Sequence, residues 1–123
     1  MIKCGISNGE LLDKLSILNI KLIMIKDEKK LIDIKREYAV ICQVSQDIIK
    51  RVQFYYDILV DINRDIWLSM DNLRVLDKGG KDWIDECYKS ILYNDRRFRV
   101  KKKINDITNS ELKEQKGYKT KKA

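Results

Sequence analysis

A repeat of apolar residues runs through the middle of the chain. Residues recur there at alternating spacings of three and four, and twelve of the fourteen positions are apolar. This spacing is typical of a helix that buries one stripe in coiled-coil-like packing. The fourteen positions are Leu31, Ile34, Tyr38, Ile41, Ser45, Ile48, Val52, Tyr55, Leu59, Ile62, Ile66, Ser69, Leu73 and Leu76.

The length of this helix is open between two models. Residues 10–78 contain neither Gly nor Pro, the two strongest helix breakers, which favours one helix over about 28–78. The alternative is two helices broken at residues 43–47, with Asp47 as the N-cap of the second.

Shorter apolar stripes on either side predict two flanking helices. Ser7 and Glu10 have the spacing of a capping box, and Asp27 is the expected N-cap of the long helix. The long helix should end at Gly79 and Gly80, and Asp82 should cap the last helix. The long helix is called the spine below. The apolar residues of the flanking helices are Leu11, Leu15, Leu18, Leu22 and Ile25 before the spine, and Trp83, Ile84, Cys87, Tyr88, Ile91, Leu92, Val100, Ile104 and Ile107 after it.

These patterns predict an all-α fold, in which a long heptad-patterned helix is flanked by antiparallel helices. We expect one helical domain over residues 1–107, followed by a basic, largely flexible tail over 108–123 with at most one short helix capped by Asn109 or Ser110. Two short flanking helices leave much of the spine half covered, so a homodimer is the expected assembly.

Charge is concentrated at the C-terminal end. Residues 1–95 carry 15 Lys and Arg against 16 Asp and Glu, whereas residues 96–123 carry 11 against 3. Such a segment suits an anionic partner, and the candidate nucleic-acid contacts are Arg99, Lys101, Lys102, Lys103, Lys119, Lys121 and Lys122. We favour the alternative that the basic run pairs with acidic residues four apart on the spine, namely Asp57, Asp61 and Asp65.

The sequence contains no motif for a metal site or a disulfide framework. There is no His, and Cys4, Cys42 and Cys87 are widely separated, so neither a zinc site nor a disulfide framework is indicated. We expect no metal and no cofactor. The sequence shows neither a signal peptide nor a membrane-spanning stretch, so we expect a cytoplasmic protein without a membrane partner.

Two stretches resemble a known family. The first, residues 7–22, follows G-E-x-x-D-K-x-x-I-L-x-I-K on Gly9, Glu10, Asp13, Lys14, Ile17, Leu18, Ile20 and Lys21; the second places N-D-R-R on Asn94, Asp95, Arg96 and Arg97, followed by Ile104 and Asn105. Together with residues 61–67, they are similar to a small all-helical family of unknown function found in bacteria, phages and large DNA viruses. Some relatives in that family are associated with polysaccharide genes, so the resemblance implies a conceivable sugar-nucleotide or glycan role.

The resemblance singles out charged residues that composition alone does not. Asp95, Arg96 and Arg97 can form a buried ion network that reaches Glu10, Asp13 or Lys14 on the first helix, or they can form an anion site. We favour the buried network. The candidate anion- or partner-binding residues are Glu10, Asp13, Lys14, Lys21, Asn94, Asp95, Arg96 and Arg97.

Three functions follow from these patterns. We favour a non-enzymatic scaffold or accessory protein that acts through homo-oligomerisation and protein binding. The alternatives are a phosphate-backbone binder that uses the basic segment, and a small helical enzyme or binder for an anionic or sugar-nucleotide ligand. The last would need cations to converge on Glu10 or Asp13, and the available ones are Lys14, Lys21, Arg64, Arg96 and Arg97. We name no catalytic residue.

Overall fold

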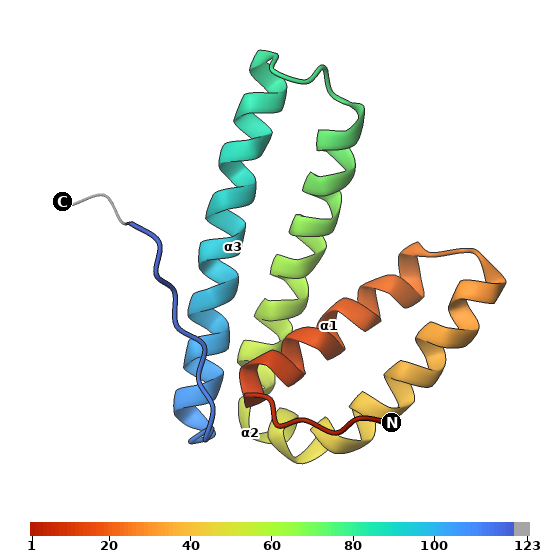
Figure 1. Cartoon of the computed structure of the whole chain (residues 1–123), viewed down its shortest axis with the longest axis vertical. Coiled ribbons are helices and arrows are strands. Elements are labelled where there is room, and N and C mark those ends of the chain that lie inside the picture. The colour runs from red at the N-terminus through yellow and green to blue at the C-terminus, as the bar shows by residue number, and fades with distance from the viewer. Residues whose placement is uncertain (120–123) are drawn as a thin grey trace.

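The described chain consists of three helices. A computed structural model describes residues 1–119, with α1 at Asn8–Met24, α2 at Glu28–Val75 and α3 at Lys81–Ile107 (Figure 1). No strand occurs within residues 1–119, so the all-α prediction is confirmed. In this part of the chain, no helix combines the length and the apolar character that a membrane crossing needs.

Local capping explains where the first two helices begin. The Ser7 side chain accepts a hydrogen bond from the Glu10 backbone N at 3.1 Å, and the Asp27 side chain accepts from the backbone N of Lys29 and Lys30. Both predicted N-caps are confirmed. The start predicted for the third helix is wrong, because Gly80 is its N-cap and Asp82 lies in its first turn. An acidic side chain there still interacts favourably with the helix dipole.

The long helix α2 is bent at Val52. This residue has φ −134° and ψ 29°, outside the helical range, so the two halves of α2 take different directions (Figure 1). A continuous straight spine is therefore wrong, and so is a break at residues 43–47 with Asp47 as a cap. Neither Gly nor Pro marks the bend. We attribute it to packing, because the halves lie against different helices.

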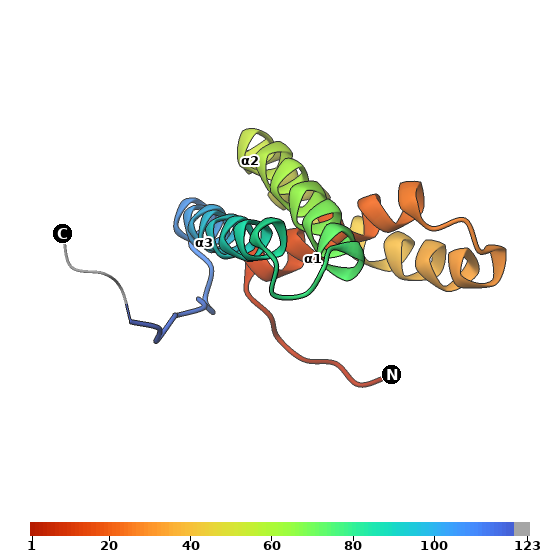
Figure 2. The ribbon, with the colours of Figure 1, turned by 90° about the horizontal axis from the view of Figure 1, so that it is seen from above.

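The bend divides the molecule into two helical hairpins. The first half of α2 runs antiparallel to α1, and the second half runs antiparallel to α3 (Figures 1 and 2). The N-terminal part of α1 lies where the hairpins meet and also contacts α3. The buried apolar core is at this junction and consists of Leu12, Leu15, Val52, Tyr56, Leu59 and Ile104.

The apolar repeat of α2 accounts for most of its buried face. Six of its positions are buried, and they are Ile34, Ser45, Val52, Leu59, Ile62 and Ser69. The two serines are satisfied locally or across the hairpin: Ser45 Oγ donates to the Ile41 carbonyl at 2.6 Å, and Ser69 Oγ lies 3.0 Å from Ser90 Oγ. Beyond the bend the buried tyrosine is Tyr56, whereas the repeat predicts Tyr55.

The segment after α3 runs back beside that helix (Figure 1). Residues 110–119 contain no helix, which agrees with the expectation of at most one short helix in this part of the chain. Thr108 and Ser110 are buried, and two ion pairs join the segment to α3: Lys113 with Asp106 at 3.4 Å and Glu114 with Lys101 at 3.4 Å. The segment thereby covers one side of α3.

Candidate functional site

A buried group of charged and polar side chains lies where the three helices meet. Asp13 of α1 is fully buried, and its Oδ1 accepts hydrogen bonds from Asn63 Nδ2 of α2 at 2.9 Å and from Arg97 Nε of α3 at 2.8 Å. Arg97 Nη2 also donates to Asp13 Oδ2, which makes the pair bidentate. Ser16 Oγ accepts from Asn63 Nδ2 at 2.6 Å. One carboxylate thus joins all three helices.

Electrostatics favour the charged form of Arg97. The hydrogen bonds from Arg97 to Asp13 raise the pKa of the Arg97 guanidinium, against the opposing effect of its partial burial. The carboxylates of Asp13, Glu10 and Glu114 raise the same pKa further. A bidentate guanidinium–carboxylate pair is among the strong hydrogen-bonded arrangements, because both partners are charged and planar.

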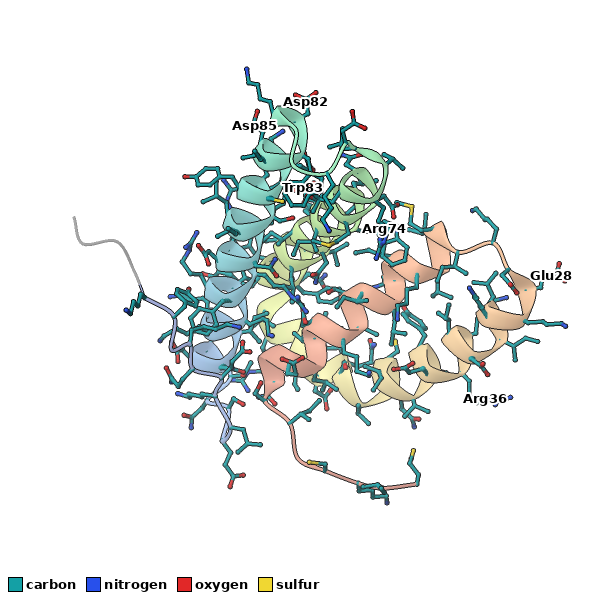
Figure 3. The ribbon with its side chains drawn as sticks, turned by 45° about the horizontal axis from the view of Figure 1, so that its top comes forward. Glu28, Arg36, Arg74, Asp82, Trp83 and Asp85 are labelled. Atoms are coloured by element: carbon teal, nitrogen blue, oxygen red, sulfur yellow. The ribbon has the colours of Figure 1, made fainter. Side chains whose placement is uncertain are left out.

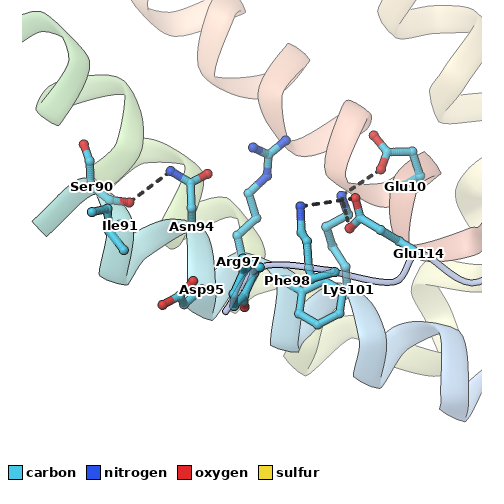
Figure 4. Close-up of a pocket in the computed structure, with 11 residues that line it drawn as sticks. Glu10, Ser90, Ile91, Asn94, Asp95, Arg97, Phe98, Lys101 and Glu114 are labelled. Atoms are coloured by element: carbon cyan, nitrogen blue, oxygen red, sulfur yellow. Dashed lines mark hydrogen bonds and ion pairs between the residues drawn. The ribbon is translucent and has the colours of Figure 1, made fainter. Parts of the chain in front are cut away.

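A second cation lies one turn further along α3. The Lys101 side chain is 7% exposed, and its Nζ lies 2.7 Å from Glu10 Oε2, 3.4 Å from Glu114 Oε1 and 3.9 Å from Asp13 Oδ2 (Figure 4). Glu10 therefore binds across the helix interface through its side chain, while its backbone N takes part in the cap at Ser7. Three carboxylates around one buried ammonium hold α1, α3 and the following segment together.

The closest approach of α1 and α3 requires a glycine. Gly9 N donates to Asn105 Oδ1 at 2.6 Å, and a Cβ at position 9 would lie 2.6 Å from the Lys101 carbonyl oxygen. Real Cβ atoms essentially never come that near to a backbone atom. Asn8 adds hydrogen bonds to Thr108 and Ser110 at 2.9 and 3.0 Å.

These contacts form a ladder between the two stretches that the sequence singles out. Residues four apart on one face of α3 each contact the start of α1, because four residues are about one helical turn. The pairs are Arg97 with Asp13, Lys101 with Glu10, and Asn105 with Gly9. The geometry that we favoured for Arg97, a buried network reaching the first helix, is present.

Other candidate anion- or partner-binding residues lie outside the network. Lys14 pairs with Glu37 at 2.8 Å on the surface, and Asn94 Nδ2 donates to the Ser90 carbonyl at 2.9 Å. Asp95 is half-buried and Arg96 is exposed. The convergence of cations that the enzyme alternative would need is present only in part: Lys14, Lys21 and Arg97 border one hollow of about 220 Å³ with Glu10 and Asp13, while Arg64 pairs with Asp61 elsewhere and Arg96 does not border that hollow.

The basic candidates divide between buried and exposed positions. Lys101 is buried in the network, and Lys102 pairs with Asp106 at 3.3 Å. Arg99, Lys103 and Lys119 are exposed, and Lys121 and Lys122 lie outside the described residues.

The predicted pairing of the basic run with the acidic row of the spine is wrong. Asp57 accepts a hydrogen bond from Gln53, and Asp61 pairs with Arg64 on its own helix. No ion pair between Asp65 and the basic run is found within residues 1–119.

Three buried polar residues of the network are not among the candidate site residues predicted from the sequence. Asn63 and Ser16 each follow an apolar position of a stripe, Ile62 and Leu15, so they read as ordinary polar neighbours. Asn105 continues the spacing of four from Arg97 and Lys101, which is a signal that could have found it. Asn63 carries no comparable signal, because its role depends on the bend of α2.

Hollows surround the network, and Arg97 borders three of them. One of about 480 Å³ lies between α3 and the segment after it, and is lined by Phe98, Lys101 and Glu114 among others (Figure 4). A second, of about 270 Å³, lies between α1 and the second half of α2, where Figure 3 labels Arg74. Within residues 1–119, no group of three or more Cys, Asp or Glu side chains is arranged to hold a metal ion.

Comparison with known proteins gives one match. No curated protein and no solved structure matches the chain. The model of one protein family matches residues 2–123, which is nearly the whole chain. The chain therefore belongs to the family described as "Family of unknown function (DUF6165)".

Proposed function

We propose that the protein is a self-associating helical scaffold, in which α3 pairs antiparallel with α3 of a second copy. The observation that carries this proposal is an exposed apolar seam on α3. Ile84, Tyr88 and Ile91 recur at spacings of four and three, and they are 55%, 63% and 59% exposed. Such spacing places the three side chains on one face, and contiguous exposed apolar faces commonly mark association surfaces.

This seam lies on the side of α3 away from its own hairpin. Ser90 is buried against Ser69 of α2, and by helical periodicity the seam residues lie about 100–160° around α3 from Ser90. Trp83 lies toward α2, while Asp82 and Asp85 lie at the outer end of α3 (Figure 3). The hairpin therefore leaves the seam exposed, and Ile91 and Asp95 at one end of it also border the hollow formed with the segment after α3.

Charge at the two ends of the seam favours a second copy as the occupant. Lys81 and Asp95 continue the same spacing, and each lies seven residues from Tyr88. A two-fold antiparallel pairing centred on Tyr88 would place Lys81 of each copy opposite Asp95 of the other, because a two-fold interface matches each surface with itself. Neither residue forms an ion pair within residues 1–119.

The phosphate-binding alternative has less support. Arg97 and Lys101 are engaged by Asp13 and Glu10, so their ammonium and guanidinium groups do not form an open surface. Arg96, Arg99 and Lys103 remain exposed on α3. Affinity for a nucleic-acid backbone grows with the number of phosphates neutralised, so the burial of Lys101 in an ion pair weakens this alternative.

The test is a charge-swap series measured by light scattering and sedimentation equilibrium. The unchanged protein should be dimeric, and Ile84→Asp should be monomeric at the same concentration. Lys81→Asp should weaken the dimer about tenfold or more, which is about 1.4 kcal/mol, because it places like charges opposite each other at both ends. Lys81→Asp combined with Asp95→Lys should restore the dimer.

Lys89→Asp is the matched control. It makes the same change of charge on α3 off the seam, at a side chain that is 58% exposed and has only a 3.9 Å pair with Glu86. The control should leave the dimer unchanged. A monomeric unchanged protein, or a double swap no better than Lys81→Asp alone, would contradict the proposal. Circular dichroism of each variant separates loss of association from loss of helix.

A further inference from the structure

A small cavity opens between α1 and the second half of α2. Its volume is about 270 Å³, just below the usual range for drug-sized ligands, so it fits one ring and not a larger molecule. Its walls are mostly apolar, and the flat indole of Trp67 is one of them. The apolar lining consists of Ile17, Ile20, Ile66, Trp67 and Met70.

Two residues of the buried network also border this cavity, and both keep hydrogen-bonding capacity. Asn63 is 4% exposed, and its Nδ2 donates to Asp13 and to Ser16, which accounts for both amide hydrogens. Its Oδ1 accepts no hydrogen bond within residues 1–119. This oxygen is not one of the side-chain atoms that the fold closes off from solvent, so a ligand N–H or O–H can reach it.

Arg97 offers the complementary group. It donates to Asp13 through Nε and Nη2, which leaves Nη1 without an acceptor among the described residues. Asn63 and Arg97 bind the same Asp13 oxygen, so they are neighbours. The cavity is therefore bordered by one residue with a free acceptor and one with a free donor.

The charges around the cavity favour a neutral ligand. Arg97 is balanced by Asp13, and Arg74 at the cavity pairs with Asp71 at 3.6 Å. A second carboxylate beside Arg97 would also face the acceptor oxygen of Asn63. An anion is therefore less well matched than a neutral group that both accepts and donates.

We infer that this cavity is a binding site for a small, flat, neutral ring with an amide edge, a carbonyl beside an N–H. Arg97 Nη1 donates to the carbonyl, Asn63 Oδ1 accepts from the N–H, and the ring lies against Trp67. A lactam ring such as a uracil-type base has this edge, and so does a ring with an external carboxamide. The site is independent of the α3 seam.

The test uses the indole N–H resonance of Trp67 in proton–nitrogen NMR spectra of the full-length protein. The probes are 1-methyluracil for the lactam and benzamide for the external carboxamide. Their controls are 1,3-dimethyluracil and N,N-dimethylbenzamide, which keep the carbonyl and lack the N–H. The matching parent compound should shift the resonance saturably, and its methylated form should bind at least about tenfold more weakly, because Asn63 Oδ1 would stay unpaired. The parent compound that binds shows whether the amide edge of the ligand belongs to a lactam ring or to an external carboxamide.

Two variants link the signal to the cavity. Trp83→Phe assigns the Trp67 resonance and should leave binding unchanged, because Trp83 does not border this cavity. Met70→Trp fills the space and should abolish the shift while the protein stays folded by circular dichroism. Equal binding of parent and methylated compounds would overturn the inference, and so would the absence of any saturable shift up to the solubility limit of both parents.

Discussion

Removing the charge of Asp13 should be the most damaging single change in the polar network. Asp13→Asn keeps the shape of the side chain and removes the negative charge that faces Arg97 and Lys101. Asp13 is fully buried, Arg97 donates to both of its oxygens, and Lys101 Nζ lies 3.9 Å away. Breaking a buried pair by removing one partner costs about 3–5 kcal/mol, because the remaining charge stays in a poorly solvated position.

That loss is large against the stability of a domain of this size. Typical unfolding free energies are about 5–15 kcal/mol, so Asp13→Asn should lower the urea midpoint strongly. The matched control is Lys14→Ala, which removes an exposed pair with Glu37 at 2.8 Å and should cost less than about 1 kcal/mol. The assay is urea unfolding by circular dichroism at one fixed protein concentration.

A double variant separates the energy of the charge pair from the effect of changed side-chain shape. Arg97→Met removes the other charge, and a well-packed apolar replacement of a buried ion pair is often neutral. Asp13→Asn with Arg97→Met should therefore be more stable than the sum of the single losses implies, by roughly 1–3 kcal/mol. The reasoning is refuted if Asp13→Asn costs no more than Lys14→Ala, or if the two losses are additive.

Two further predictions concern the helix contact and a buried phenol. Gly9→Ala should destabilise the protein by about 1–3 kcal/mol in urea unfolding, because its Cβ would lie 2.6 Å from the Lys101 carbonyl oxygen. Gly117→Ala, which meets nothing within 4 Å, should leave the midpoint unchanged, and equal midpoints for the two variants would refute the close contact. Burial, with a smaller contribution from Tyr38, raises the pKa of Tyr56 to about 12 from 10.0, so the neutral phenol is favoured in the folded state. This contribution of about 3 kcal/mol is complete below pH 10 and is lost as the pH rises to 12; Tyr56→Phe should lack that part of the pH dependence.

Some local features of the fold could be predicted from the sequence. The N-caps at Ser7 and Asp27 depend on side-chain contacts with backbone groups two or three residues away, so neighbouring residues are enough to predict them. The predicted end of the long helix at the glycine pair was wrong: its C-cap is Leu76, and Gly79, with φ 87°, lies in the turn that follows. Asp82 failed as a cap because Gly80 can begin a helix without a side-chain contact.

The bend of α2 could not be predicted from the sequence in this way. Val52 is an ordinary position of the apolar repeat, and the repeat continues on both sides of it. Nothing local requires a non-helical conformation there. Bending lets Val52, Tyr56 and Leu59 pack with Leu12 and Ile104 at one junction, and such a gain depends on all three helices being in place.

The candidate site shows the same division. The sequence was enough to name the charged residues of the two stretches that resemble the family, and one proposed network linked Arg97 to the first helix. The competing pairing with Asp57 and Asp61 had equally regular spacing and was wrong. Spacing along one helix shows which residues share a face, but it does not show which helix lies opposite. Asn63 and the amide-edge site that we infer depend entirely on that second fact.

The sequence by itself determined the all-α fold, the residues at which the first two helices begin, and the faces that carry apolar and charged residues. These are consequences of hydrogen bonds and periodicity over a few residues, so they do not depend on distant parts of the chain. Tertiary structure alone decided the bend at Val52 and the pairing of Asp13 with Arg97, which are 84 residues apart. Those choices are decided by burial, because an unpaired charge or an uncovered apolar face costs more free energy than a bent helix.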